Sequence, residues 1–210
     1  MNDPCWYTVK IDVGNAINPL FERPTPIPDK QFQMWAFPAN EIFSAEWLEY
    51  TKSLGLIFQN GFIFYKYQVI RPSAIHIDVP ADPTKKLNFG FNWVFSGGEG
   101  SKMIWYEYPK KEPEVRWITY QIPVKNSKTE WVTSSTPYVD CGHESQLTVI
   151  DEYEIKNKLT LVSTGIPHDV YNVPKDRWCM TARIDIPQET TWDYIVDYLN
   201  ERNLLEPREV

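Results

Sequence analysis

Several residue types are scarce in this 210-residue sequence, and each shortage excludes a class of protein. The three cysteines, Cys5, Cys141 and Cys179, are odd in number and far apart, so they form neither a disulfide framework nor a C-x-x-C metal knuckle. No apolar run approaches the ~20 residues of a membrane span, and residues 1–10 lack the basic and apolar regions of a signal peptide. We therefore expect a cytoplasmic protein in a reducing compartment, without membrane contact.

Clusters of positive charge are also missing. The formal net charge is −7, and no block of five like charges occurs. Proteins that bind duplex DNA or RNA carry a basic patch that neutralises phosphates, so no nucleic-acid partner is expected.

The residues that are abundant favour a β-sheet protein. Aromatic residues make up 15% of the chain, which also contains 17 prolines but only 9 glycines. Large flat side chains and frequent turns suit short strands better than a helical bundle. The length suits a single domain that spans residues 1–210.

Short apolar runs recur along the chain between turn-rich segments, which predicts an all-β sandwich or jelly roll. Asn60-Gly61 is a strong hairpin signal between two of the runs. The proline-rich stretch from Pro19 to Pro38 predicts little regular structure. The strands are predicted at residues 6–13, 56–59, 62–70, 74–79, 87–95, 103–108, 115–124, 147–150, 159–163 and 177–186.

Two helices are predicted to flank these strands. Phe43, Trp47, Tyr50 and Leu54 follow a helical period over residues 44–54, and Gly55 stands where a helix C-cap belongs. Near the C-terminus, apolar residues again follow a helical period after a possible cap at Thr190.

Histidine occurs only three times, and two of the three stand in an arrangement typical of a metal site. Because side chains alternate along a strand, His76 and Asp78 project to the same face, while Ile77 projects to the other, which the helix at 44–54 could cover. A distant strand that ends at His168 would complete two imidazoles and one carboxylate, the set that holds non-haem Fe(II). A hydrogen-bonded pair without metal is the alternative for His76 and Asp78.

Two further choices concern the third histidine and the arginines. His143 is a rival ligand, but Glu152 and Tyr153, rather than an arginine, follow it at the spacing that separates His168 from Arg177. Arg177 opens a predicted strand, and its guanidinium suits a bidentate carboxylate. Arg183 lies on the same face of that strand and could bind the carboxylate instead.

These residues resemble the Fe(II)- and 2-oxoglutarate-dependent oxygenases, which share the pattern His-x-Asp, a long gap, His, and Arg about ten residues later. The resemblance covers about residues 62–186. It implies a mainly β fold, a double-stranded β-helix (jelly roll, cupin-like) flanked by N- and C-terminal helices. Segments 87–93, 101–106 and 163–168 also look like strands of a small branch of that family.

The resemblance implies that His76, Asp78 and His168 bind iron and that Arg177 binds the distal carboxylate of 2-oxoglutarate. Cys179 stands where many relatives have Ser or Thr. Asn88 or Asn92, on one face of a predicted strand, is a candidate to donate a hydrogen bond to the cosubstrate, and Gly90 on the same face would leave room for it. The alternative is that this face is merely exposed.

The implied activity is an O₂-dependent hydroxylation of a small-molecule or peptide substrate, because Asp78 stands where halogenating relatives have a small residue. Other possibilities are a cupin-like metal-binding isomerase and a non-catalytic binding module. Arg177 distinguishes between them, since only the oxygenase requires a cation for its cosubstrate.

Overall fold

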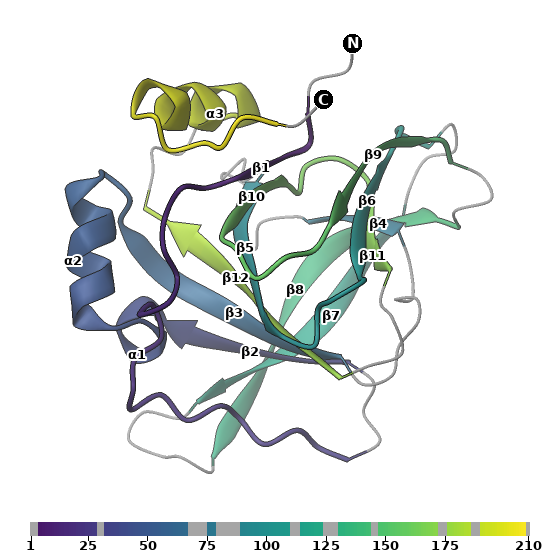
Figure 1. The fold of residues 1–210 in the computed structure, drawn as a ribbon. Helices are drawn as coiled ribbons and strands as arrows, with labels where there is room; N and C mark the ends of the chain where they lie inside the picture. The colour runs from purple at the N-terminus through teal and green to yellow at the C-terminus, as the bar shows by residue number, and fades with distance from the viewer. Residues whose placement is uncertain are drawn as a thin grey trace.

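The structure is a computed structural model that describes residues 4–28, 32–66, 75–78, 89–109, 114–123, 130–143, 147–171, 176–185 and 190–208. These residues form twelve strands and three helices (Figure 1). In chain order they are β1 (Trp6–Thr8), β2 (Phe32–Pro38), α1 (Ala39–Ile42), α2 (Ala45–Ser53), β3 (Phe58–Lys66), β4 (Ile75–Asp78), β5 (Phe89–Ser96), β6 (Lys102–Tyr106), β7 (Glu114–Pro123), β8 (Trp131–Gly142), β9 (Val149–Glu154), β10 (Thr160–Ser163), β11 (His168–Tyr171), β12 (Arg177–Ile184) and α3 (Trp192–Glu201).

All twelve strands belong to one sheet in the order β1-β10-β5-β12-β3-β2-β7-β8-β4-β11-β6-β9. The sheet curves into a nearly closed barrel (Figure 1). The predicted compact double-stranded β-helix is therefore wrong, because β2, β7 and β8 connect β3 to β4 through a continuous series of strand pairs. The sequence did not predict this connection, since β2 lies in the proline-rich stretch and β8 was not predicted.

The largest hydrophobic core lies outside the barrel, between its wall and the helices. One face of β3, β5, β10 and β12 packs there against the three helices, which lie along the same side of the molecule (Figure 1). On β12, Met180, Ala182 and Ile184 belong to this core. Strand alternation directs Arg177 and Cys179 to the opposite face, inside the barrel.

Local signals located two of the three helices, and α1 was not predicted. The helix predicted at 44–54 is α2, whose N-cap Ser44 accepts a hydrogen bond from the Trp47 amide at 3.2 Å. Gly55 follows it with a left-handed φ of +82°. The C-terminal helix is α3, although its cap is Thr191 rather than Thr190. None of the helices in the described residues is long and apolar enough to cross a membrane.

The hairpin predicted at Asn60-Gly61 does not form, because β3 continues through both residues. A Cβ atom on Gly61 would lie 2.8 Å from Ile42 Cδ1 and 3.2 Å from Met180 Sδ. Gly61 therefore allows α1 and β12 to approach β3 closely, and it is not part of a turn.

Candidate metal centre

The pairing of β4 with β11 brings the two predicted parts of the metal site together. His76 and Asp78 lie on β4, and His168 begins β11 directly opposite His76. The ring centroids of the two histidines are 4.5 Å apart, and His76 Nε2 lies 3.6 Å from Asp78 Oδ1. One possible ligand atom from each of the three residues lies within 4.8 Å of the others.

His168 is oriented to offer a lone pair. Its Nδ1 lies 2.9 Å from the Ile166 carbonyl oxygen, and because a carbonyl only accepts, Nδ1 carries the proton. Nε2 is then the free acceptor. Burial, together with the nearby charge of His76, lowers the pKa of His168 to about 4, so its ring is neutral at pH 7. A neutral imidazole held through its second nitrogen is typical of a metal ligand.

Asp78 is held as a carboxylate. Burial alone would raise its pKa, but the charges of His168, His76 and Arg183 outweigh burial and lower the pKa below its usual value. Arg183 Nη2 lies 3.4 Å from Asp78 Oδ2, which leaves Oδ1 on the side of His76. The same guanidinium donates to the Phe89 carbonyl through Nη1.

Gly90 provides the space for Arg183. A Cβ atom there would lie 2.8 Å from Thr181 Cγ2 and 3.2 Å from Arg183 Nη1. The sequence predicts that Gly90 leaves room for a cosubstrate, whereas in the structure it leaves room for two side chains of β12.

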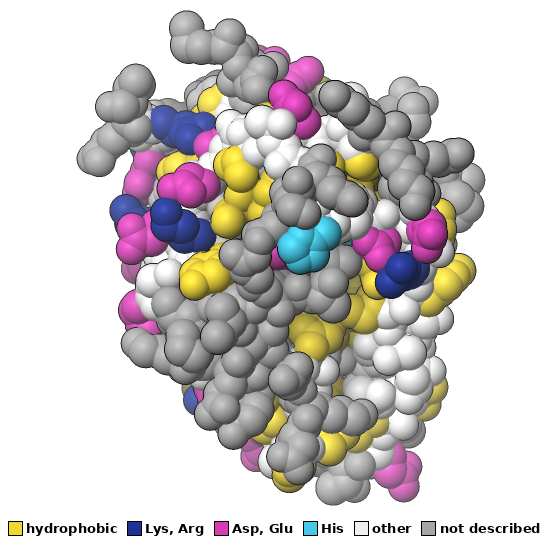
Figure 2. Space-filling view, turned by 90° about the vertical axis from the view of Figure 1, so that its right-hand side faces the viewer, with side chains coloured by type: hydrophobic (Ala, Val, Ile, Leu, Met, Phe, Trp, Pro, Cys, Tyr) yellow, Lys and Arg dark blue, Asp and Glu magenta, His cyan; other side chains and the backbone are white. Residues whose placement is uncertain are grey.

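The three residues fit a divalent transition metal. Two imidazoles and one carboxylate converge from neighbouring strands, and this donor set is the one that non-haem iron enzymes use. The site is open on one side, since the side chains of His76 and Asp78 are 30% and 33% exposed. Figure 2 faces the side of the molecule on which β4, β6, β9 and β11 lie, and it shows a histidine side chain at the surface.

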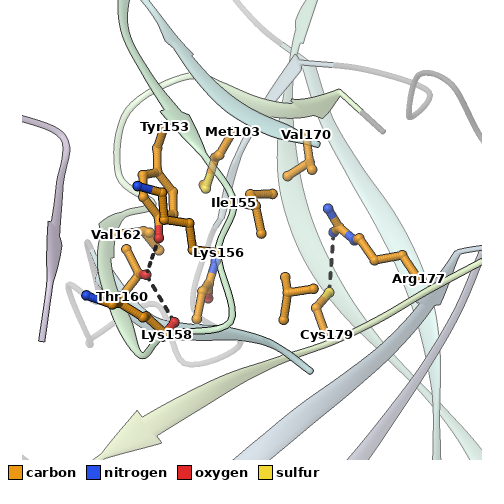
Figure 3. Close-up of a pocket in the computed structure, with 12 residues that line it drawn as sticks. Met103, Tyr153, Ile155, Lys156, Lys158, Thr160, Val162, Val170, Arg177 and Cys179 are labelled. Atoms are coloured by element: carbon orange, nitrogen blue, oxygen red, sulfur yellow. Dashed lines mark hydrogen bonds between the residues drawn. The ribbon is translucent and has the colours of Figure 1, made fainter. Parts of the chain in front are cut away.

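Arg177 lies inside the barrel without a counter-ion among the described residues. It is 3% exposed, and its Nη2 contacts Cys179 Sγ at 3.3 Å, while Nε and Nη1 have no hydrogen-bond partner in the part of the chain that the structure describes. Its guanidinium points into a cavity of about 30 Å³ lined also by Val170, Asn92 and Thr160 (Figure 3). This volume holds roughly two water-sized groups, which suits one carboxylate.

The structure thus assigns different surroundings to the two candidate arginines. Arg183 is occupied by Asp78 and the Phe89 carbonyl, whereas Arg177 retains unused donors. That Arg177 binds a cosubstrate remains a prediction, and so does a role for Asn88, which lies outside the described residues. Asn92 lines the cavity and accepts a hydrogen bond from Thr181 at 2.7 Å.

His143, the rival ligand, is exposed just beyond the end of β8 and does not belong to the cluster of three. The expected cover of β4 by the helix at 44–54 is also wrong. Ile75 packs instead with Tyr106 and Cys141, while α2 packs in the core outside the barrel through Trp47.

One buried cation near the site was missed from the sequence. Lys66 ends β3 directly opposite Arg177 and is only 8% exposed. The available signal was its position in the predicted strand at 62–70, four residues after Phe62 and on the same face.

No protein-family model matches the chain, and no curated protein matches it. Among solved structures, the X-ray structure of E. coli ycfD is similar, with 11% identity and a TM-score of 0.32. The alignment covers 70% of this chain and 31% of that one, so the chain spans less than a third of the length of that protein. At this level of similarity, neither fold nor function is transferred.

Proposed function

We propose that the protein is an Fe(II)- and 2-oxoglutarate-dependent oxygenase that hydroxylates its substrate. The observation that carries the proposal is the joint presence of two sites inside one barrel. His76, Asp78 and His168 converge as a 2-His-1-carboxylate set, and Arg177 offers a buried guanidinium with unused donors. A metal-binding isomerase would need the first site and not the second.

The residues have separate tasks in this proposal. His76, Asp78 and His168 hold the metal, and Arg177 binds the distal carboxylate of 2-oxoglutarate. When bound, iron and 2-oxoglutarate supply the activation of O₂ that oxidises a substrate C–H bond, with succinate and CO₂ as coproducts. His168, His76 and Arg183 together lower the pKa of Asp78, and Arg183 also fixes one of its oxygens. The barrel wall shields the Arg177 end of the site from water.

We propose a small molecule or a peptide as the substrate, which would approach from the exposed side of the three residues. Tyr138 on β8 lies opposite Asp78, and its ring meets that of His76 edge to face at 5.9 Å. This side therefore offers an aromatic contact to an apolar group. The net charge of −7 argues against a nucleic-acid substrate.

The test is the visible charge-transfer band that forms when 2-oxoglutarate chelates Fe(II) in the absence of oxygen. The wild-type chain should develop the band, and His76→Ala should abolish it. His143→Ala is the matched control, since His143 lies outside the cluster, and this variant should keep the band. A wild-type chain that binds neither Fe(II) nor 2-oxoglutarate would refute the proposal, and binding of metal alone would indicate the isomerase or binding-module alternative.

A further inference from the structure

Cys179 differs from the other two cysteines in its surroundings. Arg177 Nη2 donates to its sulfur at 3.3 Å, and both side chains line the small cavity inside the barrel (Figure 3). Cys5 and Cys141 belong to two separate hydrophobic clusters and do not line this cavity. Burial, together with the charge of Asp140, raises the pKa of Cys141 to about 11, so its thiol is a weak nucleophile at neutral pH. The chemistry of Cys179 should therefore differ from that of the other two.

The cavity beside Cys179 has the size of a very small polar molecule. Its volume of about 30 Å³ corresponds to roughly two water-sized groups, and hydrogen peroxide has two oxygen atoms. Arg177 is 3% exposed, and its Nε and Nη1 have no hydrogen-bond partner among the described residues. Because a buried donor without a partner costs free energy, an oxygen acceptor in this cavity is favoured. The cavity thus combines a thiol with donors for an oxygen-rich ligand.

The cavity also extends toward the surface of the molecule. Lys156 and Lys158 line it from the side opposite Arg177 and Cys179, and both lysines are exposed in the segment between β9 and β10 (Figure 3). The three residues of the candidate metal centre do not line it. A small molecule can therefore reach Cys179 from the side of the lysines without passing the metal centre.

We propose that Cys179 is a peroxide-sensitive site, at which hydrogen peroxide oxidises the thiol to a sulfenic acid while Arg177 binds the peroxide. The sulfur attacks one peroxide oxygen, so that an S–O bond forms and the O–O bond breaks. Sulfur loses two electrons and the peroxide gains them, and the departing hydroxide takes up the thiol proton and leaves as water. Arg177 holds the sulfur through Nη2 and has Nε and Nη1 for the peroxide, where it stabilises the charge on the departing oxygen. The inference is independent of the proposed function.

The product should persist as a sulfenic acid. None of the residues that line the cavity is a second cysteine, so no neighbouring thiol can convert the product into a disulfide. The added oxygen would lie beside Arg177 and give its unused donors an acceptor. Oxidation would therefore fill the cavity and exclude another anion from it.

The experiment follows the oxidation of each cysteine in the full chain, kept free of metal by a chelator so that iron cannot decompose the peroxide. The reduced chain is treated with hydrogen peroxide, the sulfenic acid is trapped with dimedone, and mass spectrometry of peptides measures the rate at each site. Cys179 should react at least about tenfold faster than Cys5 and Cys141, which serve as internal controls. Arg177→Met should slow the reaction of Cys179 by about tenfold or more. Arg23→Met in an exposed loop is the matched control and should leave the rate unchanged.

The outcomes decide the role of each part of the site. If Cys179 reacts no faster than Cys141 in the wild type, or if Arg177→Met leaves its rate unchanged, the proposal is wrong. In urea the three cysteines should react at similar rates, and a difference that persists there would show that the cavity does not cause it. Arg177→Lys replaces the Met variant if circular dichroism shows that the latter does not fold. Since neither Fe(II) nor 2-oxoglutarate is present, failure here is distinct from failure of the proposed function.

Discussion

Arg177 and Arg183 lie near the two ends of β12 and on the same face of the strand, yet the two side chains differ in their partners and in their burial. Arg183 has a carboxylate and a carbonyl as partners, and a glycine on β5 makes room for it. Arg177 is more deeply buried and lacks a counter-ion among the described residues, with Lys66 as its neighbour. The folded chain supplies partners for Arg183 by itself, whereas Arg177 keeps unused donors, which an anion would occupy if the proposed function is correct.

The largest expected effect is a loss of stability at low pH, caused by His168 in the candidate metal centre. His168 has a folded pKa of about 4, so as pH falls from 6.5 to 4 the unfolded chain takes up a proton that the folded chain does not. The metal-free protein should lose up to about 3 kcal/mol of stability in this window. Urea unfolding at several pH values measures it. His168→Gln should lack this loss, and His143→Gln should keep it; identical pH profiles for all three chains would contradict the account.

Next in size is the replacement of Arg183 by Met. This change leaves Asp78 without its cation and the Phe89 carbonyl without a donor, so the free energy of unfolding should fall by about 2 kcal/mol. Metal affinity should fall as well, because one carboxylate oxygen loses its fixed partner. Chemical denaturation and metal titration measure the two effects, and a variant as stable as the wild type would show that the pair contributes nothing.

A smaller effect is expected from Gly90→Ala. The added methyl group would meet Thr181 and Arg183, which should lower stability by about 1.5 kcal/mol and displace the guanidinium from Asp78. Gly14→Ala in an exposed loop is the control, with an expected change below about 0.5 kcal/mol. Equal effects of the two substitutions on thermal melting would mean that Gly90 has no special role.

The smallest effect has the opposite sign. Arg177→Met removes an uncompensated buried charge, so the ligand-free chain should gain about 1 kcal/mol of stability. The same measurement on Arg183→Met gives the direct contrast between the two ends of β12. Should Arg177→Met destabilise the chain as much as Arg183→Met, then Arg177 is a structural residue rather than a binding residue.

Patterns confined to one strand or helix could be predicted from the sequence. Strand alternation correctly placed Arg177 and Arg183 on one face of β12, and helical periodicity with Ser44 and Gly55 located α2. The two parts of the metal cluster could be proposed because each has its own local signal. Their meeting depends on the pairing of β4 with β11, which no local pattern encodes.

Other features depended on contacts between distant segments and were missed for that reason. Asn60-Gly61 has the residues of a turn, but the glycine is selected by packing against Ile42 and Met180. The joining of β3 to β4 through β2, β7 and β8 turns an expected jelly roll into one continuous sheet. In the sequence, Lys66 resembles an ordinary lysine at the end of a strand. Only the register of β3 and β12 shows that it lies beside Arg177.

The most direct test of the account is a titration of 2-oxoglutarate into the anaerobic Fe(II)-loaded chain, followed by the visible charge-transfer band. The wild type should form the band. Arg177→Met should bind iron with unchanged affinity but require about 100-fold more 2-oxoglutarate, because a buried charged partner of the carboxylate is lost. Equal titration curves for the two chains, or no band in the wild type, would contradict the proposal that Arg177 binds the cosubstrate.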